Sequence, residues 1–199
     1  MTTTGLKRPR ARTQHDASGA VLECRGLTKR YGQLVAVDDL SLTIAPGETY
    51  GLLGPNGAGK TTAILMVAGI LVPDAGEVVV AGTRMSVRSV AAKARVGYVP
   101  QDVALYVELS ARENLRFFAG LYGMGRRGAR SRVDEVLDIV GLADRAEETV
   151  AKYSGGMRRR LNIAVGLLHR PTLLILDEPT VATALYILAT WRLRRSITT

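Results

Sequence analysis

The sequence predicts an α/β fold built around parallel strands, and two segments carry this prediction. A short strand at 49–53 runs straight into a glycine-rich loop, and the loop leads into an apolar helix at 61–71. A second strand at 173–176 is apolar at every position and ends in two carboxylates. That pattern is typical of a parallel strand that is covered on both faces and carries polar groups at its carboxyl end.

The remaining elements fall into two groups. Short apolar or alternating runs predict strands at 21–24, 40–44 and 77–80. Between 102 and 150 the apolar spacing becomes helical, with segments 112–120 and 133–140 separated by the basic, glycine-rich stretch 123–130. We therefore expect a helical insert between the two core strands.

Composition narrows the class of protein. A chain of 199 residues that is 47% hydrophobic is long enough for one globular domain with a real core. Cys24 is the single cysteine, so no internal disulfide is expected. The longest uncharged apolar stretch, 63–72, is about half as long as a membrane-spanning helix. Much of the net charge of +9 lies in the ends, 1–20 and 182–199, which we interpret as solvated tails rather than a nucleic-acid surface.

The strongest motif is the loop at 54–61, which reads G-P-N-G-A-G-K-T and matches the phosphate-binding pattern G-x-x-x-x-G-K-T between a strand and a helix. Its glycines let successive N–H groups point inward, and the helix N-terminus favours negative charge. Lys60 is expected to reach the terminal phosphates, and the Thr61 hydroxyl to bind Mg²⁺. The residues predicted to bind nucleotide here are Gly54, Pro55, Asn56, Gly57, Ala58, Gly59, Lys60, Thr61 and Thr62.

The second motif is the acid pair after the strand at 173–176. Asp177 is predicted to hold the magnesium through water, and Glu178 to orient the attacking water. Phosphoryl transfer depends on positioning and on neutralising charge, so two carboxylates opposite Lys60 favour hydrolysis over binding alone. The alternative is a pair of acids that begins a solvated loop. It is less favoured because the same chain also carries the phosphate loop.

Three further features are similar to motifs of one family, the ABC-type ATPases. Residues 153–157, Y-S-G-G-M, resemble the ABC signature motif, with Tyr153 where leucine is most usual. Gln101 follows Val99 and Pro100 and resembles the glutamine of the Q-loop. Tyr31 lies upstream of the phosphate loop and resembles the A-loop aromatic that stacks on adenine.

This resemblance implies a P-loop NTPase domain over residues 21–181, with a RecA/F1-like parallel core, an antiparallel β subdomain and a helical subdomain at about 102–165. It further implies that Lys60, Gln101 and Glu178 act in catalysis, and that Gln101 joins Thr61 and Asp177 in binding Mg²⁺. In the signature motif, Ser154, Gly155 and Gly156 would grip the γ-phosphate held by a partner subunit.

The residue pattern of the sequence is similar to that of the ATPase subunits of bacterial ABC-2-type exporters. Such subunits dimerise head to tail, bind ATP between the phosphate loop and the signature motif, and drive a separate membrane permease. The resemblance thus implies a cytoplasmic protein that is peripheral on the inner face of the cell membrane and touches the membrane only through the permease. No nucleic-acid partner is expected.

The family pattern ends at Val181. The family would continue into a D-loop, a helix and a further parallel strand that ends in the switch histidine. Here the two histidines, His15 and His169, both precede Asp177, and residues 182–199 form a tail outside the pattern. We interpret this break as a truncation or frameshift, leave residues 1–20 as a disordered leader, and expect the C-terminal part of the core to be missing.

The missing strand lies between the two core strands in this family, so its loss is expected to leave both with unpaired edges and to make folding marginal. The apolar run at 184–191 is too close to Asp177 for a parallel crossover, which leaves an antiparallel pairing, an appended helix or a membrane-docking helix as alternatives.

Three functions follow from these observations. The first is an ATP-hydrolysing subunit of an exporter, and the second is a nucleotide-binding remnant with little hydrolysis. The third is a soluble ABC ATPase that acts on ribosomes or DNA, which usually carries tandem domains or long coiled-coil inserts that are not seen here.

Overall fold

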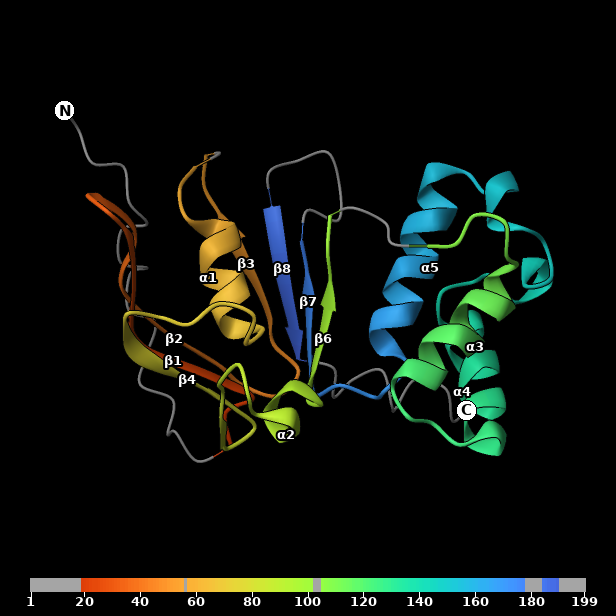
Figure 1. The fold of residues 1–199 in the computed structure, drawn as a ribbon, viewed down its shortest axis with the longest axis horizontal. Helices are drawn as coiled ribbons and strands as arrows, with labels where there is room; N and C mark the ends of the chain where they lie inside the picture. Colours follow the sequence, from red (N-terminus) through yellow and green to blue (C-terminus); the bar gives the residue numbers. More distant parts are fainter. Residues whose placement is uncertain (1–18, 56, 102–104, 178–183, 190–199) are drawn as a thin grey trace. The chain divides into compact units, whose positions relative to one another are not determined.

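The computed structural model describes residues 19–55, 57–101, 105–177 and 184–189 (Figure 1). The chain divides into two compact units. The first holds the residues up to Tyr98 together with those from Thr172 onward, and the second is Val99–Pro171. The second unit is largely helical.

The first unit contains an antiparallel sheet in the order β2-β1-β4-β5. Its strands are β1 (Leu22–Tyr31), β2 (Leu34–Ile44), β4 (Ala75–Val80) and β5 (Thr83–Arg84). The first two strands are much longer than the segments predicted from sequence. They continue through charged residues because the side chains pair across the sheet, as Arg25 does with Glu77 at 2.8 Å, and because register shifts absorb the irregular spacing.

The second sheet of this unit carries the predicted core strands, in the order β3-β8-β7-β6. Its members are β3 (Thr49–Leu53), β8 (Ala184–Ala189), β7 (Leu173–Leu176) and β6 (Val96–Val99). Both β3 and β7 have the bounds predicted from sequence.

The expectation of unpaired edges on β3 and β7 was wrong. Strand β8 lies between them and pairs antiparallel with both, from Thr49 opposite Leu188 on one side to Leu176 opposite Tyr186 on the other (Figure 1). Of the three alternatives for this segment, the antiparallel pairing is the one observed. The connection from Leu176 to Ala184 is shorter than a parallel crossover needs, so an antiparallel return is what the chain can make.

The helix that follows the glycine loop is α1 (Lys60–Val67), whose buried side chains include Ala63, Ile64 and Met66. It ends earlier than the predicted residue 71 because Gly69 has a positive φ of 69°. Residues with a side chain rarely adopt this backbone conformation, so glycine is favoured at this turn. The short helix α2 (Val90–Lys93) is preceded by Ser89, whose side chain caps it.

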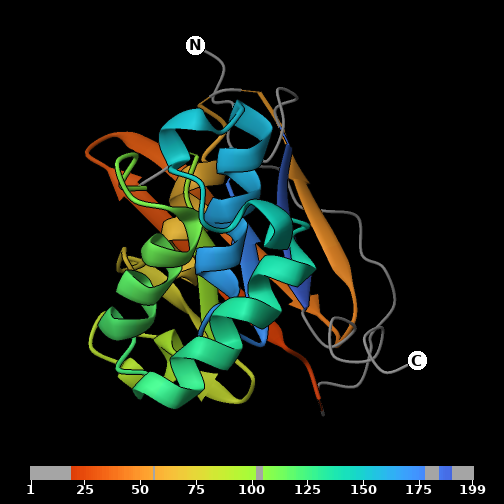
Figure 2. The ribbon, with the colours of Figure 1, turned by 90° about the vertical axis from the view of Figure 1, so that its right-hand side faces the viewer.

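The second unit is built from three longer helices, which lie side by side (Figure 2). They are α3 (Ala111–Leu121), α4 (Arg126–Ile139) and α5 (Gly155–Leu167), with 3₁₀ turns at Ala143–Arg145 and Val150–Lys152. A capping box between Ser110 and Glu113 starts α3. Helix α4 begins inside the basic stretch that was predicted to separate two helices, because arginine has good helix propensity.

The core of the second unit is apolar, and Leu115, Val133 and Leu161 are fully buried there. Arg132 is buried among these helices and donates from Nε to the carbonyl of Leu168 at 3.0 Å. Within the described part of the chain, no helix is long and apolar enough to span a bilayer.

Candidate nucleotide site

The glycine loop connects β3 to α1 and places its residues around the start of the helix. Gly59 is the residue just before α1 and has a φ of 85°. A Cβ there would lie 2.0 Å from the carbonyl oxygen of Ala36, so the loop can pass this point only as glycine. Gly57 also has a positive φ, of 82°. Asn56, also predicted to bind nucleotide, lies outside the described residues.

Lys60 is the first residue of α1 and is only 6% exposed. Its Nζ donates to the carbonyl oxygens of Gly54 at 2.6 Å and Pro55 at 2.9 Å. The ammonium group is therefore held inside the loop by its neutral carbonyls. Phosphate oxygens are stronger acceptors for this cation than carbonyls are, because both partners of that bond are charged.

The two threonines after Lys60 occupy the first turn of α1, where helix N–H groups have no partner within the helix. Thr61 is exposed and Thr62 is half-buried. A hydroxyl oxygen at Thr61 is the type of hard ligand that Mg²⁺ accepts.

Asp177 directly follows β7 and is 7% exposed. The hydroxyl of Tyr98, on β6, donates to Asp177 Oδ2 at 3.2 Å. Burial, together with the charge and hydrogen bond of Asp177, raises the pKa of Tyr98 to about 12. Glu178, the predicted water-orienting residue, lies outside the described residues.

The sheet brings the glycine loop and Asp177 to the same side of the sheet, where β3 and β7 have their carboxyl ends. Because β3 and β7 both run antiparallel to β8, they run parallel to each other. Gly51 and Leu176 both pair with Tyr186, so β3 continues for two residues, to Leu53, beyond the level at which β7 ends. With one strand between them, β3 and β7 lie about 10 Å apart across the sheet.

Magnesium fits the oxygen donors at this edge. A buried carboxylate and a helix hydroxyl match the ion's preference, and Mg²⁺ usually takes its remaining ligands from water and substrate phosphates. No group of three or more His, Cys, Asp or Glu side chains gathers for metal binding in the described ranges, so a cage made entirely of such side chains is not found there.

Tyr31 ends β1 and is 51% exposed. Lys29 Nζ lies 5.8 Å from the centroid of its ring. A half-exposed aromatic ring at a strand end has the open surface that stacking on a base needs.

The signature segment begins helix α5 in the second unit. Ser154 is its N-cap, and the Ser154 hydroxyl accepts a hydrogen bond from the Met157 N–H at 3.3 Å. Gly155 and Gly156 follow in the exposed first turn, where a Cβ would meet nothing within 4 Å. Tyr153 replaces the usual leucine without leaving its hydroxyl unsatisfied, because it donates to the Arg145 carbonyl at 2.7 Å.

Gln101 is exposed, and the residue before it is tied to α5. The Pro100 carbonyl accepts from Arg159 Nη1 at 2.6 Å and from Asn162 Nδ2 at 3.4 Å. Both donors belong to the helix that the signature motif opens. Sequence reasoning missed Arg159 and Asn162, because neither carries a motif and their shared partner is a backbone atom.

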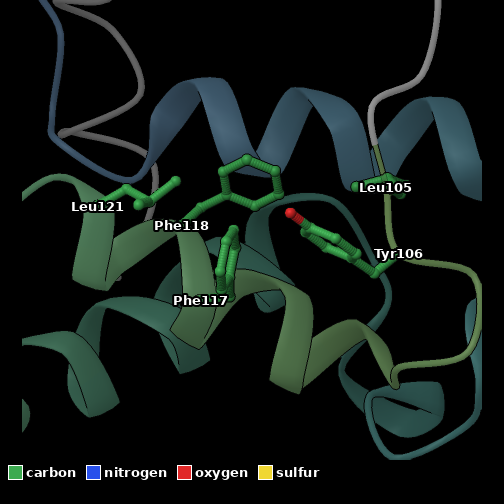
Figure 3. Close-up of a pocket in the computed structure, with 5 residues that line it drawn as sticks. All are labelled: Leu105, Tyr106, Phe117, Phe118 and Leu121. Atoms are coloured by element: carbon green, nitrogen blue, oxygen red, sulfur yellow. The ribbon is translucent and has the colours of Figure 1, made fainter.

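An apolar pocket lies on the surface of the second unit (Figure 3). Its volume is about 350 Å³, and it is lined by Leu105, Tyr106, Phe117, Phe118 and Leu121. The rings of Tyr106 and Phe117 meet edge to face with centroids 4.9 Å apart. Phe117 is 40% exposed and Leu121 is 68% exposed, so the pocket opens to solvent.

A glycine loop between a strand and a helix, with a carboxylate at the end of a parallel strand of the same sheet, defines a P-loop nucleotide-binding domain. The sequence model of the ABC transporter family matches residues 37–181, and the chain belongs to this family.

Curated relatives share almost half of the aligned residues. The linearmycin resistance ATP-binding protein LnrL of Bacillus subtilis is 45% identical over 161 residues, which cover 81% of this chain and 52% of the relative. The daunorubicin resistance ATP-binding protein DrrA3 of Streptomyces coeruleorubidus is 47% identical, covering 78% of this chain and 49% of the relative. The Nod factor export ATP-binding protein I of Sinorhizobium fredii is 45% identical, covering 82% and 48%. The chain thus spans about half the length of these relatives.

Solved structures agree with the fold. An ATP-binding subunit of an ABC transporter superposes with a TM-score of 0.66 at 28% identity, covering 81% of this chain and 67% of the other. CbiO1 of Clostridium perfringens, described as part of the ABC transporter complex CbiONQ, gives a TM-score of 0.71 at 26% identity, covering 79% and 65%.

Proposed function

We propose that this chain binds and hydrolyses ATP as part of a subunit that energises an ABC-type exporter through a separate permease. One observation carries the proposal: β3 and β7 deliver the Lys60 loop and Asp177 to the same edge of one sheet. The curated relatives support the direction of transport, since their names refer to drug resistance and export.

In this proposal each nucleotide contact has a defined source. Lys60 exchanges its two carbonyl partners for the β- and γ-phosphates, and the N–H groups of the loop and of the first turn of α1 surround them. Tyr31 stacks on adenine. Thr61, Asp177 and Gln101 would hold Mg²⁺, whose charge would offset that of the phosphates, and Glu178 would orient the attacking water.

The signature residues act on a second copy of the chain. In a head-to-tail homodimer, the exposed amides of Gly155 and Gly156 and the hydroxyl of Ser154 contact the γ-phosphate bound by the partner subunit. The absence of a Cβ at both glycines leaves the start of α5 open to a phosphate group.

The permease is proposed to contact the apolar pocket of the second unit. Exposed aromatic side chains such as Phe117 and Tyr106 are costly in water and typical of protein contact surfaces. A cytoplasmic loop of the permease that carries an apolar side chain matches this pocket. Such contact would place the chain on the inner face of the cell membrane.

A second candidate function, nucleotide binding with little hydrolysis, is favoured by the direction of β8. In the family a parallel strand that ends in the switch histidine occupies the position between β3 and β7, whereas here an antiparallel strand fills it. An antiparallel strand delivers its carboxyl end to the opposite edge of the sheet and cannot supply that histidine to the site.

Steady-state phosphate release, measured beside ATP binding by the purified chain, tests both functions. Hydrolysis that is abolished by Glu178→Gln supports the first function and excludes the second. ATP binding without phosphate release supports the second function. A chain that binds no ATP in the presence of Mg²⁺ would contradict both.

A further inference from the structure

Tyr98 lies on β6, the strand next to β7 in the sheet. Its hydroxyl donates to Oδ2 of Asp177, the carboxylate at the end of β7, at 3.2 Å. Nothing in the motif pattern assigns this tyrosine a role. The hydrogen bond joins two neighbouring strands at the point where the magnesium carboxylate leaves the sheet.

The hydrogen bond is partly shielded from water. Tyr98 is half-buried, and its hydroxyl lies against Asp177. Asp177 is 7% exposed, so it has little contact with water that could replace the tyrosine. Groups that hydrogen-bond to a metal-binding carboxylate fix its orientation and strengthen metal binding.

We propose that Tyr98 is a positioning residue for magnesium: its hydroxyl holds the Asp177 carboxylate in the orientation that the ion of Mg·ATP requires. The inference rests on the proposed function, because it needs ATP to bind at Lys60. Tyr98 does not touch nucleotide in this account. Its effect therefore appears only where Mg²⁺ is present.

The test measures how strongly Mg²⁺ promotes nucleotide binding. The dissociation constant of AMP-PNP, an ATP analogue that is not hydrolysed, is determined by calorimetry in EDTA and in Mg²⁺. The constant in EDTA divided by the constant in Mg²⁺ is the magnesium ratio, and this ratio is compared among variants. Tyr98→Phe removes only the hydroxyl. Tyr50→Phe is the matched control, because Tyr50 is also half-buried and lies on β3 of the same sheet.

We expect Tyr98→Phe to lower the magnesium ratio by about tenfold or more, the usual effect of removing a group that orients a metal ligand. Its affinity in EDTA and its melting temperature should match those of Tyr50→Phe. An unchanged magnesium ratio would overturn the inference, and so would an equal loss of affinity in EDTA, which would indicate a structural role. If the unmodified chain binds no AMP-PNP, the proposed function itself fails.

Discussion

Strand β8 can be tested by removing one backbone N–H. Ile187 pairs with Tyr50 on one side and with Ile175 on the other, so its N–H belongs to one of the two ladders. Ile187→Pro deletes that hydrogen bond and leaves a sheet carbonyl without its donor, which costs about 2–4 kcal/mol in total. Typical domains have only about 5–15 kcal/mol of stability. Urea unfolding, followed by circular dichroism, should therefore show a midpoint lower by roughly 1–2 M.

Ile187→Val is the control for this experiment, because it keeps the N–H and the branched side chain. The valine variant should unfold close to the unmodified chain. If the proline variant unfolds at the same urea concentration as the valine variant, β8 does not pair between β3 and β7, and the description of this sheet is wrong.

Three further variants or reagents test separate parts of the structure. Gly59→Ala places a Cβ 2.0 Å from the Ala36 carbonyl oxygen, so its melting temperature and its ATP affinity should both fall, and an unchanged melting temperature would contradict the loop geometry. Burial raises the pKa of the Cys24 thiol to about 12, which suppresses the reactive thiolate. Iodoacetamide at pH 8 should therefore label Cys24 only after the chain unfolds. Rapid labelling of the folded chain would show that Cys24 is not buried. Arg159→Ala removes the shorter of the two hydrogen bonds to the Pro100 carbonyl and should slow phosphate release by about tenfold or more with little change in ATP affinity. Arg160→Ala, whose side chain binds the Val140 and Gly141 carbonyls instead, should leave that rate unchanged, and equal effects of the two variants would argue against Arg159 as an anchor.

The parts of the fold that sequence predicted are those set by local pattern. Strands β3 and β7 were predicted with the correct bounds, because each is a continuous run ended by a glycine loop or an acid pair. The length of β1 did not follow, since its second half depends on partners in β2 and β4.

The position of β8 shows the limit of reasoning from motifs. Its apolar run was recognised as able to pair, but the family pattern favoured a missing strand with open edges. Connection length determined the outcome, because the connection from Leu176 to Ala184 is too short for a parallel crossover. In the site, Lys60 and Asp177 were predicted from motifs, whereas Tyr98 could not be, because its role depends on β6 lying next to β7.

The binding of Mg·ATP by the purified chain tests the central claim most directly. Calorimetry should show saturable binding to the unmodified chain and a loss of about tenfold or more in affinity for Lys60→Ala, since the charged partner of the phosphates is gone. Lys93→Ala is the matched control, because Lys93 also donates to a backbone carbonyl, that of Val87, but lies outside the loop. Equal binding by the Lys60 and Lys93 variants, or no binding by the unmodified chain, would contradict the account.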